Sequence, residues 1–414
     1  MNRCFKESHK TAMITKTKIC HITTGHIAFD NRIFHKECKT LAASGEFDVA
    51  LIAQHDNGGT IDGVRLLAIS KSRGLLWKLT VTVAEALVKA VRHKADVYHF
   101  HDPEFIIAAL VLGAVTGGKV IYDVHEDYEK QTRYRDDMPW WLTRAAAFLF
   151  KKIEKTVPRF FYGVMTATED ILQNFSFHKR AICIKNYPVV SYFNDRPQKL
   201  KSGNGQFNAV YIGGINKERG IFEMVRSLAA VDRKIKLTVY GRFESESCRK
   251  KIEATEGCEK VKFAGWKQHH EVVGNLSRFD AGLVCLHVKP NFLTSLPVKM
   301  FEYMAAGLPV VASNFPLWRQ IIEKSGCGIC VDPYDPMDIA HALEFLASNP
   351  EAASQMGQRG RRAIAEQYSW EGEKKKMLNF YRGIPLVNVS ANTEKKVSIG
   401  SDLAHGGSDN DKAG

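Results

Sequence analysis

The fold is decided by the stretch Thr294-Ser-Leu-Pro-Val-Lys-Met-Phe-Glu-Tyr-Met-Ala-Ala-Gly-Leu-Pro309, which leads into the apolar run Val310-Val-Ala-Ser313. Pro297 suits the first position of a helix, and Gly307 followed by Pro309 is a typical helix end. The apolar run after it is typical of a buried strand. The stretch therefore predicts a short helix that leads directly into the core of a sheet.

The charged residues of this helix bear on function. At about 100° per residue, Lys299, Glu302 and Tyr303 share one face, and the opposite face is apolar. We therefore expect one buried face and one charged, exposed face. A lysine in the first turn opposes the helix dipole unless an anion is bound there. Two interpretations stay open: a phosphate site at this helix start, or a solvated Lys299/Glu302 ion pair.

Both parts of the chain alternate apolar strands with helices, and a polar stretch separates the two parts. Strands without polar alternation, joined by helices, predict a parallel sheet that is covered on both faces. The expected strands include 18–23, 49–53, 96–101 and 119–125 before the polar stretch, and 207–214, 235–240, 281–287 and 309–313 after it. The fold class is therefore α/β, with two doubly wound domains.

The same pattern divides the chain into segments. We expect an N-terminal extension at 1–17, a first domain at 18–190, a linker at 191–206, a second domain at 207–368, a helix at 369–383 and a disordered tail at 384–414. The tail is polar and low in large apolar residues, which is typical of disorder. Its Asp409-Asn-Asp411 is interpreted as solvated charge, because a metal site needs a rigid loop.

Composition narrows the class of protein. The chain has 414 residues and a net charge of +13, and the excess of basic residues is spread over both parts. We therefore expect no dedicated nucleic-acid surface. The N-terminal residues lack the apolar segment of a secretory signal, and the nine cysteines lack the spacing of a disulfide framework. We expect a cytoplasmic protein, with no metal bound at the single CxxC, Cys327-Gly-Ile-Cys330.

Histidines and acids follow two of the expected strands. They form His99-Phe-His101-Asp102-Pro-Glu104 and His125-Glu126-Asp127. Ligands of open parallel sheets bind beyond the carboxyl ends of the strands, so these groups predict a site. In the second domain, Gly213-Gly214 with Arg219 at a helix start places backbone amides and a cation where an anion can bind.

A basic helix is expected at 139–155. It begins with Trp140-Trp141 and ends with Lys151, Lys152 and Lys155. Such a helix can lie on an anionic membrane surface. It can equally be a domain helix whose aromatic residues belong to the core, and both interpretations stay open.

Four motifs together resemble the family-4 retaining glycosyltransferases of the GT-B architecture, in particular those that build bacterial surface polysaccharides. The motifs are Tyr211-Ile-Gly-Gly-Ile-Asn-Lys-Glu-Arg-Gly220, Leu296–Pro309, His99–Glu104 and Tyr122-Asp-Val-His-Glu-Asp127. The resemblance implies two Rossmann-like domains facing each other across a cleft, a nucleotide-diphosphate sugar as donor, and a saccharide acceptor that is carried on a lipid at the inner face of the cell membrane. It implies no cofactor, and the lack of an Asp-x-Asp in a folded context implies no metal at the diphosphate.

The resemblance also assigns roles to residues of this chain. Glu302 is expected to hold the ribose and Arg219 with Lys299 the diphosphate, while His125 faces the reacting sugar. The remaining donor-side positions are Gly213, Gly214 and Thr294, and the acceptor-side positions are Asp30, Arg32, His101, Asp102 and Glu126. Two positions depart from the family pattern: Thr294 stands where a glutamate is usual, and Gly214 stands where an arginine is usual.

Two other functions fit the same architecture. A nucleotide-sugar 2-epimerase would convert a UDP-sugar without an acceptor. A non-catalytic sugar-binding subunit of a polysaccharide assembly complex would show no donor hydrolysis. A dehydrogenase is excluded, because Thr23-Thr-Gly-His-Ile-Ala28 has one glycine where a dinucleotide fingerprint needs three.

Overall fold

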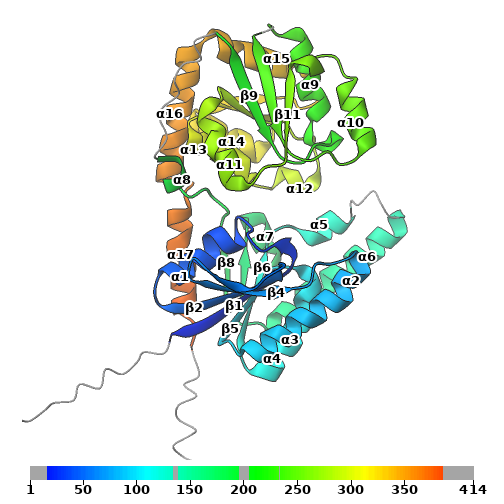
Figure 1. Ribbon diagram of the computed structural model, residues 1–414, viewed down its shortest axis with the longest axis vertical. Helices are drawn as coiled ribbons and strands as arrows, with labels where there is room; N and C mark the ends of the chain where they lie inside the picture. The colour runs from blue at the N-terminus through cyan, green and yellow to red at the C-terminus, as the bar shows by residue number, and fades with distance from the viewer. Residues whose placement is uncertain (1–15, 134–138, 195–204, 233, 386–414) are drawn as a thin grey trace, which may run out of the picture. The chain divides into compact units, whose positions relative to one another are not determined.

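Two parallel sheets form the frame of the computed structural model, which describes residues 16–133, 139–194, 205–232 and 234–385 (Figure 1). The chain divides into one unit from Met1 to Met377, which holds both sheets, and a second from Leu378 to Gly414. Most of the expected N-terminal extension and tail, including Asp409-Asn-Asp411, lies outside the described residues. We call residues 16–194 the N-terminal half and residues 205–377 the C-terminal half.

The N-terminal half contains an eight-stranded sheet in the order β3-β4-β2-β1-β5-β6-β7-β8. Every pair of neighbours is parallel except β3 and β4. The strands are β1 (Thr17–Ile27), β2 (Phe47–Gln54), β3 (Gly59–Ile61), β4 (Val64–Ile69), β5 (Val97–Phe100), β6 (Lys119–Val124), β7 (Gly163–Thr166) and β8 (Ala181–Cys183). All four residues of β5 and of β7 are buried, as expected for strands that are covered on both faces.

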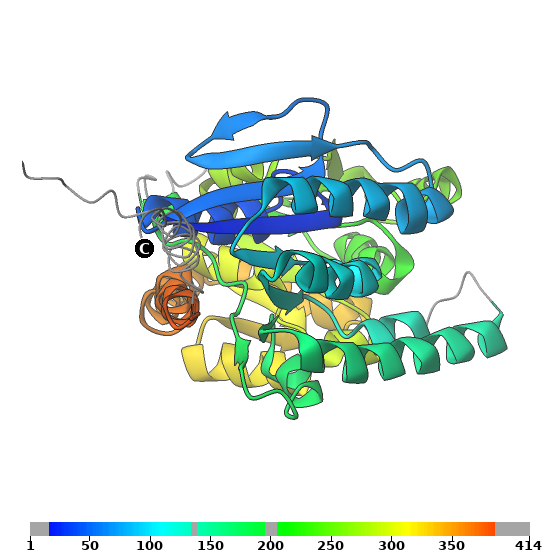
Figure 2. The same cartoon turned by 90° about the horizontal axis from the view of Figure 1, so that it is seen from below.

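Helices cover this sheet. They are the π-helical η1 (Ile33–Cys38) and η2 (Lys78–Thr82), α1 (Lys39–Ala43), α2 (Leu75–Trp77), α3 (Val83–His93), η3 (Pro103–Phe105), α4 (Ile106–Thr116), α5 (Tyr128–Arg133), α6 (Trp140–Thr156), η4 (Val157–Phe160) and α7 (Glu169–Asn174). The last helix, α8 (Ser191–Asn194), places Phe193 in the hydrophobic core of the C-terminal half instead. Figure 2 shows α3, α4 and α6 side by side over one face of the sheet. Within the expected linker, the described residues Ser191–Asn194 thus form a short helix.

The C-terminal half contains a six-stranded, all-parallel sheet in the order β11-β10-β9-β12-β13-β14. Its strands are β9 (Phe207–Ile212), β10 (Ile235–Tyr240), β11 (Val261–Gly265), β12 (Ala281–Val284), β13 (Val310–Ser313) and β14 (Gly328–Val331). Its helices are η5 (Lys217–Arg219), α9 (Ile221–Ala230), α10 (Glu246–Glu253), η6 (Cys258–Lys260), α11 (His269–Asn275), η7 (Leu276–Arg278), α12 (Pro290–Leu293), α13 (Val298–Ala306), α14 (Pro316–Ser325), α15 (Pro336–Ser348), α16 (Pro350–Glu366) and α17 (Trp370–Arg382), which runs into the second unit. The predicted fold class, with two parallel α/β sheets, is confirmed.

Helix α13 differs from its expected form in one respect. It begins at Val298 and ends before Gly307, whose φ of +77° favours glycine, and it leads into β13. All residues from Lys299 to Ala306 are buried, so the expected exposed, charged face is wrong. The reason is that α13 packs against β12 and β13 on one side and against α16 on the other. The backbones of α13 and α16 approach so closely that a Cβ at Gly357 would lie 2.0 Å from the carbonyl oxygen of Gly307.

The length and composition of the described helices bear on membrane insertion. Among the helices of the described ranges, none combines the length and the apolar composition that crossing a membrane would require.

Candidate active site

A cavity of about 350 Å³ lies beyond the carboxyl ends of β1 and β6 and beside the start of α13. Both halves of the chain contribute to its lining. Among the residues that the sequence singled out, the cavity is lined by Asp30, Arg32, His125, Glu126, Arg219 and Thr294. The remaining candidates, which are His101, Asp102, Gly213, Gly214, Lys299 and Glu302, are not among its lining residues.

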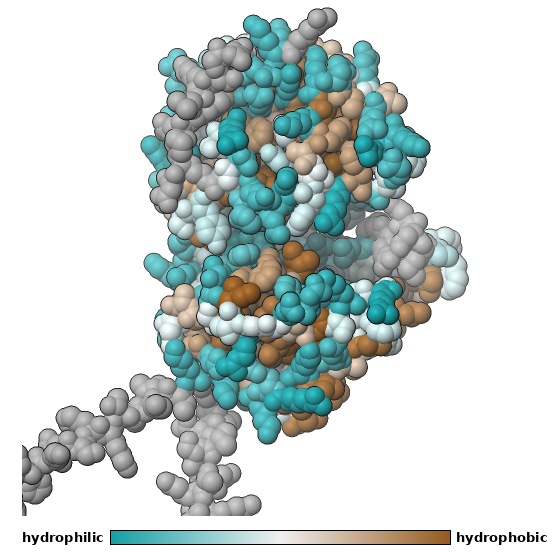
Figure 3. Space-filling model, viewed as in Figure 1, coloured by the Kyte–Doolittle hydropathy of each residue, from teal (hydrophilic) through white to brown (hydrophobic). Residues whose placement is uncertain are grey.

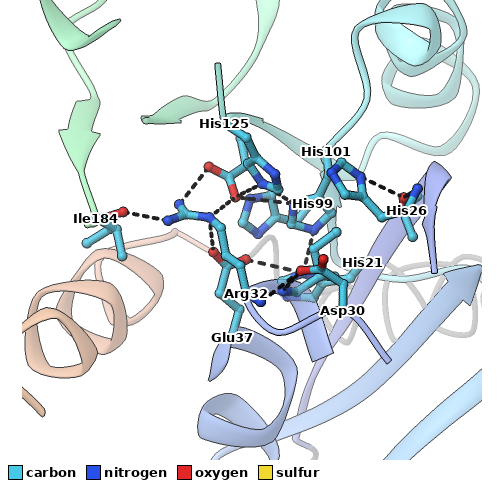
Figure 4. A network of polar contacts seen from close by, with 12 residues as sticks. His21, His26, Asp30, Arg32, Glu37, His99, His101, His125 and Ile184 are labelled. Atoms are coloured by element: carbon cyan, nitrogen blue, oxygen red, sulfur yellow. Dashed lines mark hydrogen bonds and ion pairs between the residues drawn. The ribbon is translucent and has the colours of Figure 1, made fainter. Parts of the chain in front are cut away.

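Asp123, near the end of β6, is the centre of a buried network on the N-terminal side of the cavity, and Figure 4 shows its partners Arg32, His101 and His125. Its carboxylate accepts two hydrogen bonds from Arg32, at 3.1 Å from Nε and 2.9 Å from Nη2. The same carboxylate lies 2.8 Å from His125 Nε2 and 3.2 Å from His101 Nδ1. Burial alone would raise the pKa of Asp123, but Arg32 and His125 hold it well below its ordinary value. A fixed negative charge therefore orients the ring of His125, which reaches the cavity.

Arg32 is only 3% exposed, and its guanidinium is bound by other groups of the N-terminal half. Besides Asp123, it pairs with Glu37 at 2.9 Å and donates to the carbonyl oxygen of Ile184 at 2.7 Å. Burial would lower the pKa of Arg32, but the two carboxylates raise it above its ordinary value. The expected acceptor-side cation is thus part of the frame beneath the cavity. Asp30 begins the turn that carries Arg32, because its Oδ1 accepts from the backbone N–H groups of Arg32 and Ile33 at 2.8 and 3.0 Å.

His101 and Asp102 lie behind the cavity lining. His101 is fully buried, and burial lowers its pKa to about 4, so the ring is neutral. Asp102 accepts hydrogen bonds from Thr23 Oγ1 at 2.6 Å and from the backbone N–H of Thr24 at 2.7 Å. Its Oδ1 also lies 3.0 Å from Nδ1 of His26, a cavity residue. Although burial opposes it, these contacts lower the pKa of Asp102, so the carboxylate stays ionised and holds His26 in place.

His26 and Asp123 are site residues that the sequence analysis missed. The signal for His26 was its place directly after the carboxyl end of the first expected strand, beside Gly25. A Cβ on Gly25 would lie 2.5 Å from Oδ1 of Asp102, so a larger residue there would displace this carboxylate. Asp123 carried no signal of its own, because its partners Arg32 and His101 are distant in the sequence.

Lys299 is a buried basic residue of the C-terminal half. Its side chain is 9% exposed, its Nζ lies 4.2 Å from the centre of the Tyr211 ring, and it has no hydrogen-bond partner among the described residues. A Cβ on Gly213 would lie 2.8 Å from this Nζ, so the ammonium sits directly under the Gly213-Gly214 turn. Burial and the charge of Arg219 lower the pKa of Lys299 well below its ordinary value. A buried amine without a partner is costly, and an anion at this turn would supply the partner.

Arg219 stands at the cavity beside this turn. Its backbone N–H donates to Asn216 Oδ1 at 3.1 Å, which caps η5, and its guanidinium lies 5.4 Å from the centre of the Phe292 ring. Gly220 follows with a φ of +68°, and a Cβ there would lie 1.8 Å from the carbonyl oxygen of Cys285. The glycine therefore fixes the position of the arginine between η5 and α9.

Glu302 is 5% exposed, and its Oε1 lies 2.5 Å from Nε2 of His269, the first residue of α11. The described residues contain no ion pair between Glu302 and Lys299. The interpretation as a solvated Lys299/Glu302 pair is therefore wrong, because both side chains are buried and Glu302 pairs with a histidine. His269 is a further residue that the sequence analysis did not identify. Thr294 follows α12 and reaches the cavity, where the family pattern has a glutamate.

Known proteins resemble this chain in sequence and in structure. Residues 193–363 match the family model of the glycosyl transferases group 1. Glycogen synthase from Mycobacterium tuberculosis is 23% identical over 171 residues, so the match spans 40% of this chain and 40% of that relative. Sucrose-phosphate synthase from Thermosynechococcus elongatus is 16% identical and covers 89% of this chain and 98% of its own, with a TM-score of 0.69. HepE from Anabaena, in complex with UDP and glucose, is 11% identical and covers 89% of this chain and 100% of its own, with a TM-score of 0.68.

The structural likeness extends over both halves, and it confirms the GT-B fold that the motifs implied. The match to the family model spans residues that include the Gly213-Gly214 turn, Arg219, Lys299 and Glu302. Residues 193–363 thus resemble the glycosyl transferases group 1, within a chain that has the GT-B fold.

Proposed function

We propose that this protein transfers a sugar from a nucleotide-diphosphate sugar to a saccharide acceptor, with retention of the anomeric configuration. The observation that carries the proposal is Lys299, a buried amine without a hydrogen-bond partner among the described residues, beside Arg219 and under a glycine turn. Two cations with no anion between them fit a diphosphate. The group 1 family match over these residues and the UDP in the HepE structure support the same ligand class.

The proposed mechanism needs no nucleophile from the protein. Breaking the bond between the sugar and the diphosphate leaves negative charge on the diphosphate, which Arg219 and Lys299 stabilise. The acceptor hydroxyl attacks from the side of the leaving group, and a diphosphate oxygen takes its proton, which yields retention. His125, oriented by Asp123, contacts the reacting sugar, and Asp30 and Glu126 line the acceptor side of the cavity.

The experiment that tests this function is a thermal-shift panel of UDP-, GDP-, ADP- and dTDP-sugars. A donor at a hundred times its dissociation constant stabilises the protein by about 2.7 kcal/mol. The sugar that carries the correct base should therefore raise the Tm more than the others. Failure of every nucleotide sugar to stabilise the protein would contradict the proposal. Conversion of a UDP-sugar without an acceptor would identify a 2-epimerase instead, and binding without any turnover would identify a non-catalytic subunit.

Donor binding should depend on pH through Lys299. In the empty site its pKa is lowered well below the ordinary value, whereas a bound diphosphate raises it. Binding therefore takes up a proton, and donor affinity falls as the pH rises from the pKa of the empty site to that of the complex. Titration calorimetry in buffers of different ionisation enthalpy measures this uptake. The Lys299→Met variant should lose it, and an unchanged uptake in that variant would contradict the assignment.

Transfer should not require an added divalent cation. The charge on the leaving group is met by Arg219 and Lys299, which are fixed parts of the protein. We therefore expect the same initial rate in the presence of EDTA, Mg²⁺ or Mn²⁺. A rate that vanishes in EDTA and returns with magnesium would show that a metal binds the diphosphate.

The acceptor is proposed to be lipid-linked, in the synthesis of O-antigen, capsule or exopolysaccharide, with the N-terminal half resting on the membrane. Trp140 and Trp141 of α6 are 70% and 60% exposed, so the interpretation of these residues as core is wrong. Lys152 lies over the ring of the exposed Phe148 at 4.8 Å. Figure 3 shows hydrophobic residues gathered on the face where α3, α4 and α6 lie. Exposed aromatic residues flanked by lysines fit an anionic lipid surface.

Liposome flotation tests this association. We expect binding to anionic vesicles that weakens with salt and falls when Lys151, Lys152 and Lys155 become glutamine. A matched control replaces Lys250 and Lys251 of α10, in the other half of the chain. Equal recovery on neutral and anionic vesicles, or equal loss in the control, would remove the membrane surface as a partner.

A further inference from the structure

Four side chains meet in the core of the N-terminal half, behind the cavity (Figure 4). They are His21 of β1, Glu37 of η1, His99 of β5 and His101, which follows β5, and all four are 0% exposed. One nitrogen or oxygen atom from each lies within 4.8 Å of the corresponding atoms of the others. Three imidazoles and a carboxylate in a dry core form a set of donors that the proposed sugar transfer does not use.

The fold brings these residues together by register. His21 is the partner of His99 across the parallel strands β1 and β5, so the two side chains stand on the same face of the sheet. His101 follows two residues after His99 and continues on that face. Glu37 comes from η1, which packs beside the sheet as a π-helix, a form that is frequent at functional sites.

The donor atoms are close to the spacing of a metal site. Nδ1 of His21 lies 3.0 Å from Nε2 of His101 and 3.9 Å from Oε2 of Glu37. Four ligands in a tetrahedron around Zn²⁺, with bonds of about 2.0–2.1 Å, are about 3.3 Å apart. Oε2 of Glu37 accepts no hydrogen bond from a described residue. All separations among the four atoms are within 4.8 Å, which exceeds this tetrahedral spacing by at most about 1.5 Å.

In two of these side chains, the nitrogen or oxygen atom that is remote from His21 already has a polar contact of the kind found around bound metals. Nδ1 of His101, the nitrogen remote from His21, lies 3.2 Å from Asp123. Oε1 of Glu37, the oxygen remote from His21, lies 2.9 Å from Nε of Arg32. A carboxylate on a ligating histidine and a cation on a ligating carboxylate orient the ligands, and such contacts are typical around bound metals.

We propose that His21, Glu37, His99 and His101 bind one divalent transition-metal ion, with Zn²⁺ as the ion that best fits three imidazoles and one carboxylate. Four protein ligands leave no open position, so the site is structural. It joins β1, η1 and β5, and through His101 it fixes Asp123, which orients His125. The site is separate from the diphosphate cations Arg219 and Lys299, so it does not depend on the proposed function.

Metal content is the first test. Protein produced in medium with ample zinc and dialysed against EDTA should retain about one zinc per chain, because no ligand is exposed to the chelator. Replacement of zinc by Co²⁺ during refolding should give the visible absorption of a tetrahedral complex. Unfolding with guanidinium and chelator, followed by refolding with and without Zn²⁺, should give a higher Tm with zinc.

Variants locate the site. Glu37→Gln combined with His99→Gln should abolish the bound zinc, whereas His93→Gln in α3 should leave it unchanged. Asp123→Asn should weaken zinc binding by about 10- to 100-fold, as expected for an outer contact.

Three outcomes would overturn the proposal. They are a wild-type protein free of metal after growth with zinc, a Tm that zinc leaves unchanged on refolding, or zinc retained by the Glu37/His99 variant. If that variant does not fold, the metal content and the refolding of the wild type decide alone. A metal-free result would mean that the four side chains form a hydrogen-bonded network without an ion.

Discussion

Replacing Lys299 by alanine should lower the turnover number about a hundredfold, the usual effect of losing one group that stabilises a developing negative charge. The charge on the diphosphate grows as the glycosidic bond breaks, so the loss is larger in the transition state than in the bound donor. Donor affinity should therefore fall less than turnover. Arg219→Ala should behave in the same way, because its guanidinium stands at the same turn.

Two controls separate this effect from damage to the fold. Glu302→Ala should mainly weaken donor binding, because ribose hydroxyls gain no charge during the reaction. Lys236→Ala, at an exposed position of β10, should leave both constants unchanged. Steady-state kinetics of the folded variants measure the split between kcat and KM. Turnover near that of the wild type in both cation variants would contradict the mechanism.

Replacing Arg32 by methionine should cost about 3–5 kcal/mol of unfolding free energy, because it leaves buried carboxylates without their cation. Asp123 and Glu37 are both fully buried, and Arg32 contacts each of them. Urea denaturation measures the loss. The exposed pair Arg249/Glu253 provides the matched control, since Arg249→Met should change stability little.

A compensated variant sharpens this test. Asp123→Asn and Glu37→Gln, added to Arg32→Met, remove the charges that were left without a partner, and much of the lost stability should return. A loss in Arg32→Met no larger than in Arg249→Met would show that the buried network is not held together by its charges.

The fold followed from the sequence because its signals are local. Apolar strands such as 119–124 lack polar alternation, and this alone predicts a parallel sheet. The ends of α13 followed equally from Pro297 and Gly307. The burial of Lys299 and Glu302 could not be predicted in this way, because the residues that cover them, Tyr211 of β9 and His269 of α11, are distant in the sequence.

The candidate site, too, could be predicted from the sequence only in part. The strand-end motif pointed to His125 and Glu126, the family resemblance pointed to Asp30, and the structure places all three at one cavity. Arg32 and Asp123, however, are 91 residues apart, and no local pattern pairs them. Arg32, which was expected at the acceptor side, lines the cavity, and its ion pair with the buried Asp123 is the part that the sequence did not indicate.

The contact between Glu302 and His269 bears on which nucleotide the donor carries. If Glu302 holds the ribose as proposed, an incoming donor competes with an imidazole that already occupies the carboxylate at 2.5 Å. A ribose offers two neighbouring hydroxyl groups in exchange for this contact, whereas a 2′-deoxyribose offers one fewer. On this proposal we expect His269 to compete with the donor for Glu302, and thus to favour UDP-, GDP- and ADP-sugars over dTDP-sugars before any contact with the base is made.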